Sequence, residues 1–157
     1  MRPITALATI FIATLGLSAC VENVPEADGV IVLESEYSFN QTIDRIEAEA
    51  ANRGARIIAR VDHAANAATT GVDMDDATLI IFGNPALGTP LIAENRTAGL
   101  DLPVRMLVWE EDDDIWIAYT DPGEIALRHG LDAGGEAVTQ MIEALEGFAR
   151  EVAGEDD

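Results

Sequence analysis

The first nineteen residues have the pattern of an export signal, so they are not expected to contribute to the fold. Met1 and Arg2 give a short positive start, and residues 4–17 are almost all apolar. This apolar stretch is shorter than the roughly twenty residues that a membrane-spanning helix needs. We therefore expect residues 1–19 to be removed as a signal peptide, which leaves 138 of the 157 residues.

The signal closes with Leu17-Ser18-Ala19-Cys20, which resembles the bacterial lipobox. In a lipobox, small residues admit the peptidase and the cysteine sulfur carries a diacylglyceryl group. Cys20 is the only cysteine in the chain, so an intramolecular disulfide is impossible. The resemblance implies lipidation at Cys20, and the protein would be anchored to a membrane through that lipid. An uncleaved membrane helix and an ordinary signal peptide are the alternatives.

The residue after Cys20 indicates the membrane in which the lipoprotein would be anchored. Val21 stands there instead of an aspartate, a pattern that resembles lipoproteins sorted to the outer membrane in Gram-negative cells. If the host is Gram-negative, we expect a protein that is exported and lipid-anchored in the outer membrane, facing the periplasm.

The charge of the chain excludes several function classes. It has 29 acidic and nine basic residues and a formal net charge of −20. Such a surface repels nucleic acid, because binding a phosphate backbone needs clustered basic side chains. All nine basic residues are arginine, so Schiff-base chemistry and a P-loop lysine are absent. The acidity itself indicates solubility more than cation binding.

The part of the chain after the signal has the size of a single domain. We expect a lipidated tether over residues 20–29, a domain over residues 30–153 and an acidic tail over residues 154–157. Strands are expected at residues 30–37, 55–62, 78–82, 104–109 and 115–119, and the last two form a hairpin. Helices are expected after Ser38 and at residues 63–70, 89–95, 121–129 and 136–152.

These elements predict an α+β fold in one compact domain. A mainly antiparallel sheet of about four to five strands would pack against helices, and the C-terminal helix would be long and amphipathic. Its apolar face is marked by residues spaced three and four apart, namely Val138, Met141, Ile142, Leu145, Phe148 and Val152.

Several short segments stand in the order seen in a known family. They are Asp62-His63, Gly71, Phe82-Gly83-Asn84-Pro85, Gly88-Thr89-Pro90-Leu91, Leu100-Asp101-Leu102-Pro103, Tyr119 and His129. From about Tyr37 to Phe148, the chain resembles the family called domain of unknown function 302. The resemblance implies a small α+β domain that forms homodimers and has no assigned activity.

The polar residues of these segments are candidates for a site. His63 and His129 are the only histidines, and as a pair they could bind a metal or move protons. Asp62 and Asp101 could orient an imidazole or complete a ligand set, and Tyr119 could donate a hydrogen bond. The structural alternatives are a helix C-terminal cap for His129 and a satisfied loop for His63.

Asn84 lies in a turn-forming segment that could also serve a ligand. A helix beginning near Thr89 would present free N–H groups to an anion, although Pro90 lacks one such donor. Glycine and asparagine in such a segment more often serve a turn. We therefore keep Asn84 as a candidate ligand-binding residue and favour the structural interpretation.

No reaction follows from the sequence, because HExxH, CxxC and EF-hand patterns are all absent. We expect an envelope binding or interaction module for a small molecule, a metal or a protein partner. An acid-base enzyme of unknown reaction using His63 and His129 is the alternative, and a purely structural lipoprotein is the third. The sequence identifies neither a cofactor nor a ligand. Convergence of His63, Asn84, Asp101 and His129 in one cleft would favour the first two.

Overall fold

The computed structural model describes residues 27–155, so the export signal, Cys20 and most of the tether lie outside the described residues. In chain order the elements are β1 (Val30–Glu34), α1 (Phe39–Asn52), β2 (Arg56–Asp62), α2 (His63–Thr69), β3 (Ala77–Gly83), α3 (Pro85–Glu94), the 3-10 helix η1 (Arg96–Leu100), β4 (Val104–Glu111), β5 (Asp114–Thr120), α4 (Pro122–His129) and α5 (Glu136–Ala153).

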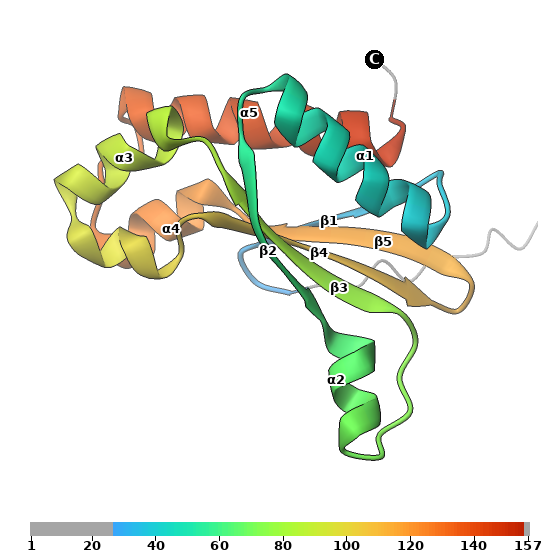
Figure 1. Cartoon of the computed structure of the whole chain (residues 1–157). Helices are drawn as coiled ribbons and strands as arrows, with labels where there is room; N and C mark the ends of the chain where they lie inside the picture. Colours follow the sequence, from blue (N-terminus) through green and yellow to red (C-terminus); the bar gives the residue numbers. More distant parts are fainter. Residues whose placement is uncertain (1–26, 156–157) are drawn as a thin grey trace, which may run out of the picture.

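The five strands form one antiparallel sheet in the order β1-β5-β4-β3-β2. In the middle of the sheet, Met106 of β4 lies opposite Ile80 of β3 and Tyr119 of β5. Helices α1, α3 and α5 lie on one side of the sheet, and α2 projects on the other side (Figure 1). The predicted α+β domain with an antiparallel sheet is confirmed.

The core lies between the sheet and the helices α1 and α5. The expected apolar face of α5 is buried at Val138, Met141, Leu145, Phe148 and Val152. The Phe148 ring stacks on Phe82 of β3 with 4.8 Å between the ring centroids. This contact joins the C-terminal helix to a central strand, and it lies beside the candidate site described below.

Strand β1 ends at Glu34, three residues earlier than expected. Ser35 is buried, and its hydroxyl lies 2.7 Å from the hydroxyl of Thr42 on α1. The next residue, Glu36, bonds through its backbone N–H to the carbonyl of Ala153 at the end of α5. These contacts take the chain away from the sheet and into α1, whose capping box at Ser38 and Gln41 is as predicted.

Helix α3 begins at Pro85 instead of near Thr89. The Asn84 side-chain oxygen accepts a hydrogen bond from the backbone N–H of Ala86, so Asn84 is the N-cap. Pro85 occupies the first turn, where its missing N–H costs nothing. Thr89 and Pro90 therefore lie inside the helix, and the helix start expected at Thr89 was wrong.

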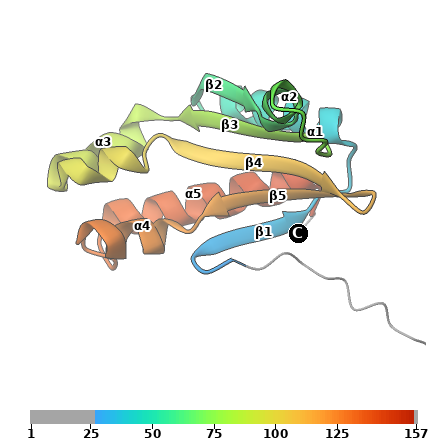
Figure 2. The same ribbon diagram turned by 90° about the horizontal axis from the view of Figure 1, so that it is seen from below.

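The outward side of the sheet is also apolar. Side chains alternate across a strand, so the row formed by Leu79, Leu107 and Ala118 faces away from the core residues Ile80, Met106 and Ile117. Figure 2 shows β1, β4 and β5 on this side with no helix in front of them. Among residues 27–155, no helix is both long and apolar enough to cross a membrane.

Candidate functional site

Five of the six candidate residues lie at one or the other end of the sheet, and the sixth, Tyr119, lies in the core. Asp62 ends β2 opposite Thr78, and His63 begins α2 at that same end. At the other end of β2, Arg56 lies opposite Gly83, which precedes Asn84. A seven-residue strand is roughly 20 Å long. His63 is therefore separated from Asn84 by the length of the sheet.

Asp62 and His63 serve the start of α2. The Asp62 carboxylate accepts a hydrogen bond of 2.7 Å from the backbone N–H of Ala65, which is an N-cap contact. His63 is half-buried at the first position of that helix. In the part of the chain that the structure describes, no group of three or more His, Cys, Asp and Glu side chains could hold a metal ion.

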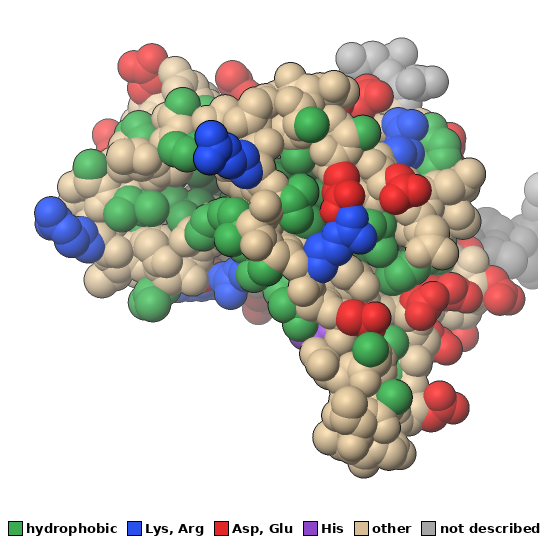
Figure 3. Space-filling model, viewed as in Figure 1, with side chains coloured by type: hydrophobic (Ala, Val, Ile, Leu, Met, Phe, Trp, Pro, Cys, Tyr) green, Lys and Arg blue, Asp and Glu red, His purple; other side chains and the backbone are tan. Residues whose placement is uncertain are grey.

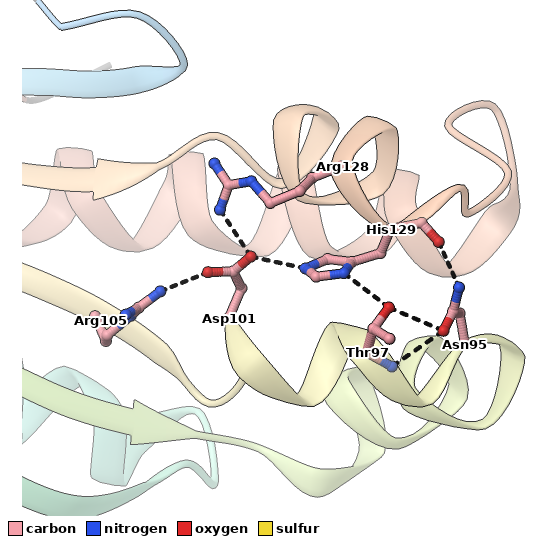
Figure 4. A network of polar contacts seen from close by, with 6 residues as sticks. All are labelled: Asn95, Thr97, Asp101, Arg105, Arg128 and His129. Carbon is pink, nitrogen blue, oxygen red and sulfur yellow. Dashed lines mark hydrogen bonds and ion pairs between the residues drawn. The ribbon is translucent and has the colours of Figure 1, made fainter.

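Asp101 and His129 are brought into direct contact at the opposite end. Asp101 follows η1, His129 ends α4, and both side chains are buried. The His129 Nε2 atom lies 2.7 Å from a carboxylate oxygen of Asp101. Because an ionised carboxylate only accepts hydrogen bonds, this ring nitrogen carries a proton and donates it. Figure 4 shows the pair and its neighbours.

The second ring nitrogen of His129 joins the same helix to η1. Its Nδ1 atom lies 2.9 Å from the Thr97 hydroxyl, and Asn95 donates its side-chain N–H to the His129 backbone carbonyl at 2.7 Å. Asn95 is also the N-cap of η1 and accepts from the backbone N–H of Thr97. We call Asn95, Thr97, Asp101, Arg105, Arg128 and His129 the polar network (Figure 4).

Two arginines form ion pairs with the Asp101 carboxylate. Arg105 contacts one carboxylate oxygen at 2.6 Å, and Arg128 contacts the other at 2.8 Å. Burial alone raises the pKa of Asp101, but hydrogen bonds from His129 and Arg128 and the charges of both arginines outweigh it. The pKa of Asp101 is therefore held below its ordinary value, and the carboxylate is ionised at neutral pH.

The order Thr97, His129, Asp101 resembles the hydrogen-bond order of a hydroxyl nucleophile, a histidine base and an orienting carboxylate. Thr97, however, has a single hydroxyl hydrogen, and Asn95 Oδ1 lies 2.9 Å from the same oxygen as an alternative acceptor. The backbone contacts of Asn95 and Thr97 make this pair a helix cap. The polar network therefore has a structural role, because its contacts hold η1, α4 and β4 together.

Tyr119 belongs to the core and lies outside the polar network. It is buried in β5, on the side of the sheet that faces the helices. Burial, followed by the negative charges of Glu146 and Asp121, raises the pKa of Tyr119 to about 12. The phenol is therefore protonated throughout the physiological pH range.

An apolar pocket of about 310 Å³ opens at the same end of the sheet, between α3, α5 and the adjoining strand ends. Its walls are Arg53, Ala55, Ile58, Phe82, Gly83, Asn84, Pro85, Leu87, Gly88, Thr89, Ile92, Leu102, Pro103, Val104, Met141, Ala144, Leu145 and Phe148. In Figure 3, hydrophobic side chains gather over this region, between α3 and the start of β2. Neither Thr97 nor His129 lines the pocket.

The sequence did not predict this pocket, although residues of three family-like segments line it. They come from Phe82-Gly83-Asn84-Pro85, from Gly88-Thr89 and from Leu102-Pro103. The segments around Asn84 and Thr89 were interpreted from their polar or turn-forming residues. The available signal was the apolar residues that the three segments also contain, such as Phe82 and Leu102. Only the fold shows that they surround one space.

Polar contacts fix the edge of the pocket where α1 ends. Asn84 donates a side-chain hydrogen bond of 3.2 Å to the carbonyl of Arg53. The guanidinium of Arg53 forms an ion pair with Glu49 and donates to the carbonyls of Ala144 and Gly147 on α5, both at 3.1 Å. Asn84, the candidate ligand-binding residue, thus connects α3 to the chain segment that carries Arg53.

The chain is similar to part of "Fluoride-specific ion channel FluC 1" of Brucella suis biovar 1 (strain 1330). The identity is 40% over 116 residues, which are 73% of this chain and 46% of that protein. It is equally similar to "Fluoride-specific ion channel FluC 2" of Brucella melitensis biotype 1, covering 43% of it. The chain therefore spans less than half the length of these relatives.

A solved structure has the same fold. The crystal structure of the uncharacterized conserved protein DUF302 from Bacillus stearothermophilus superposes with a TM-score of 0.73 at 18% sequence identity. The superposition covers 80% of this chain and 99% of the other. The family model for domain of unknown function DUF302 matches residues 31–148, most of the chain. The family match, together with the shared motifs and architecture, shows that the chain belongs to the DUF302 family.

Proposed function

We propose that the protein is a lipid-anchored envelope module that binds a small, mainly apolar molecule in the pocket between α3 and α5. The observation that carries this proposal is a space of about 310 Å³ with mostly apolar walls. Protein interiors are otherwise packed to the density of organic crystals, and few voids exceed the size of a water molecule. A space of this size at a surface is typical of a ligand site.

The size of the pocket suits a small ligand. An apolar cavity of about 150 Å³ is sufficient to bind benzene, and this pocket has about twice that volume. Its walls come from helices and strand ends that are held by the core, for example through the stacking of Phe82 on Phe148. A ligand would therefore enter a largely preformed site.

The other two functions have less support. The acid-base enzyme using His63 and His129 requires both imidazoles to reach one substrate, but the two residues lie at opposite ends of the sheet. A purely structural lipoprotein would leave the pocket without a role.

The envelope location is part of the proposal and rests on the sequence of residues 1–20. Labelling cells with an alkyne fatty acid tests it, because the proposal requires label on the wild-type protein and none on Cys20→Ala. Label on both proteins, or on neither, would remove the anchor from the proposal without affecting the pocket.

Native mass spectrometry of the protein purified from its host tests the binding function. We expect a retained small molecule on the wild-type protein and its loss in Ala144→Phe, which places a ring in the pocket. Ala51→Phe is the matched control, because Ala51 is exposed on α1 and does not line the pocket. Equal retention in Ala144→Phe and Ala51→Phe would refute binding in the pocket.

We also propose that the protein is a homodimer that pairs through the outward side of the sheet. An antiparallel sheet open to water usually alternates apolar and polar faces. Here the outward row of Leu79, Leu107 and Ala118 is apolar, and Trp109 stacks on Trp116 with 6.4 Å between ring centroids. Sedimentation should give twice the mass of one chain for the wild type and a single chain for Leu107→Arg. A wild-type monomer would refute the dimer.

A second candidate function follows from the Brucella relatives, because 40% identity links this domain to proteins named as fluoride-specific ion channels. In this candidate the domain would assist fluoride handling beside a channel. Deletion of the gene should then make the host more sensitive to fluoride, with complementation restoring growth. Unchanged fluoride sensitivity would count against this candidate and leave the apolar pocket unaffected.

A further inference from the structure

We infer that the ligand of the pocket is an anionic amphiphile, with a short apolar body inside the pocket and a carboxylate bound by Arg53. This inference rests on the proposed binding function and specifies the chemical class of the ligand. It follows from the position and free donors of one guanidinium at the pocket wall.

Arg53 is the only charged side chain among the described residues that line the pocket. The remaining walls are apolar apart from Asn84 and Thr89. The guanidinium carbon of Arg53 lies 5.7 Å from the centroid of the Phe148 ring, and Phe148 lines the same pocket. A ligand against Phe148 would therefore have a positive charge within reach of one end.

The guanidinium is held in place by contacts that leave donors unused. Nε faces Glu49, one terminal nitrogen donates to the carbonyl of Ala144, and the other donates to that of Gly147. A guanidinium has five N–H groups, so these contacts leave one N–H on each terminal nitrogen. A free N–H of this kind can donate a charge-assisted hydrogen bond to a carboxylate oxygen of a ligand.

Preorganisation favours this site over an ordinary surface arginine. Arg53 is tied to α1 through Glu49 and to α5 through two carbonyls, so little side-chain freedom remains to be lost on binding. Glu49 reduces the net charge near the guanidinium but lies on its Nε edge. The unused N–H of a terminal nitrogen remains available to a ligand carboxylate.

The volume limits the apolar body of the ligand. About 310 Å³ corresponds to roughly ten times the volume share of a water molecule in the liquid. A straight chain of about eight carbons therefore suits the pocket, whereas a long-chain fatty acid would project from it. Octanoate and octan-1-ol are suitable probes because they share this chain and differ in the charge of the headgroup.

The test is calorimetric titration of residues 20–157 carrying Cys20→Ser with each probe. This part contains every described helix and strand. The solved relative has the same fold, and the superposition covers 99% of its chain. We expect octanoate to bind at least tenfold more tightly than octan-1-ol. Equal affinities would overturn the carboxylate inference while supporting an apolar pocket. Binding of neither probe would contradict both the inference and the proposed function.

Variants of Arg53 locate the headgroup. Arg53→Met keeps an apolar stem but removes the charge, so the tenfold preference for octanoate should disappear while octan-1-ol binds as before. Arg56→Met is the matched control, because Arg56 is exposed nearby on β2 and does not line the pocket. An unchanged preference in folded Arg53→Met would overturn the assignment. If this variant does not fold, Arg53→Gln provides the same comparison.

Discussion

The polar network and the apolar pocket lie at the same end of the sheet, but their interactions are complete to different degrees. In the network, both Asp101 oxygens and both ring nitrogens of His129 have partners within 2.9 Å. In the pocket, apolar side chains such as Leu87 and Phe148 border a space that no other side chain fills. The difference supports our proposal that the polar residues stabilise the fold and that a ligand occupies the pocket.

The physical reason lies in the different costs of burying the two kinds of group. A buried carboxylate is destabilising unless it is paired and hydrogen-bonded, so Asp101 requires the neighbours it has. Apolar walls that face one another across a space lose dispersion contacts and the benefit of leaving water. A ligand that fills the pocket recovers both contributions without breaking any existing bond.

The largest effect on stability should come from removing Asp101. Asp101→Ala leaves the buried His129 without its acceptor, and we expect the free energy of unfolding to fall by roughly 2–3 kcal/mol. A larger loss is not expected, because the side chains of Arg105 and Arg128 are 42% and 55% exposed and can be solvated. Urea unfolding measures the change.

The affinity of the pocket for octanoate should be unchanged in folded Asp101→Ala, because Asp101 does not line the pocket. Glu143→Ala, at an exposed position of α5, is a control for the loss of an acidic side chain. A tenfold loss of octanoate affinity in Asp101→Ala alone would show that the two regions are coupled.

The pH dependence of the free energy of unfolding should reveal the contribution of Asp101 in the polar network. The pKa of Asp101 is lower in the folded protein than in the unfolded chain, so the unfolded state binds the proton more readily. The stabilisation from Asp101 is therefore present above its unfolded pKa of about 3.9 and is lost as the pH falls through its folded pKa. In unfolding titrations between pH 6 and pH 2, the stability difference between wild type and Asp101→Asn should shrink below about pH 4. A constant difference would contradict this assignment.

A smaller effect is expected at Thr97. Thr97→Val keeps the shape but removes the hydroxyl that contacts His129, so the free energy of unfolding should fall by about 1 kcal/mol. Ligand binding should not change, and thermal unfolding with and without octanoate measures both quantities. A variant as stable as wild type that loses the bound host ligand would favour a functional hydroxyl instead.

The sequence predicted the elements whose signals are local. The three-and-four spacing in α5, the capping box at Ser38 and the stop at Gly130 each depend on neighbouring residues, and all three are confirmed. Gly130 adopts a φ of 60°, a conformation that most other residues avoid. The start of α3 was wrong because Gly83-Asn84-Pro85 was interpreted as a break between elements, whereas Asn84 and Pro85 begin a helix.

The site depended on contacts between segments far apart in the chain. Asp101 and His129 were both candidates, but spacing along the chain did not show that they touch while His63 lies at the far end of the sheet. The roles of Arg105 and Arg128 were missed, because charged residues on a strand or helix usually face solvent. Arg53 was missed for the same reason, since its contacts with α5 span more than ninety residues of sequence.

The central claim is that ligand binds in the apolar pocket and not at the polar network. Titrating the ¹⁵N-labelled chain of residues 20–157 carrying Cys20→Ser with octanoate, followed by two-dimensional amide NMR, tests it residue by residue. The account predicts saturable shifts at Gly83, Gly88 and Phe148, which line the pocket, with little change at Thr97 and His129. Shifts confined to Thr97 and His129 would contradict it.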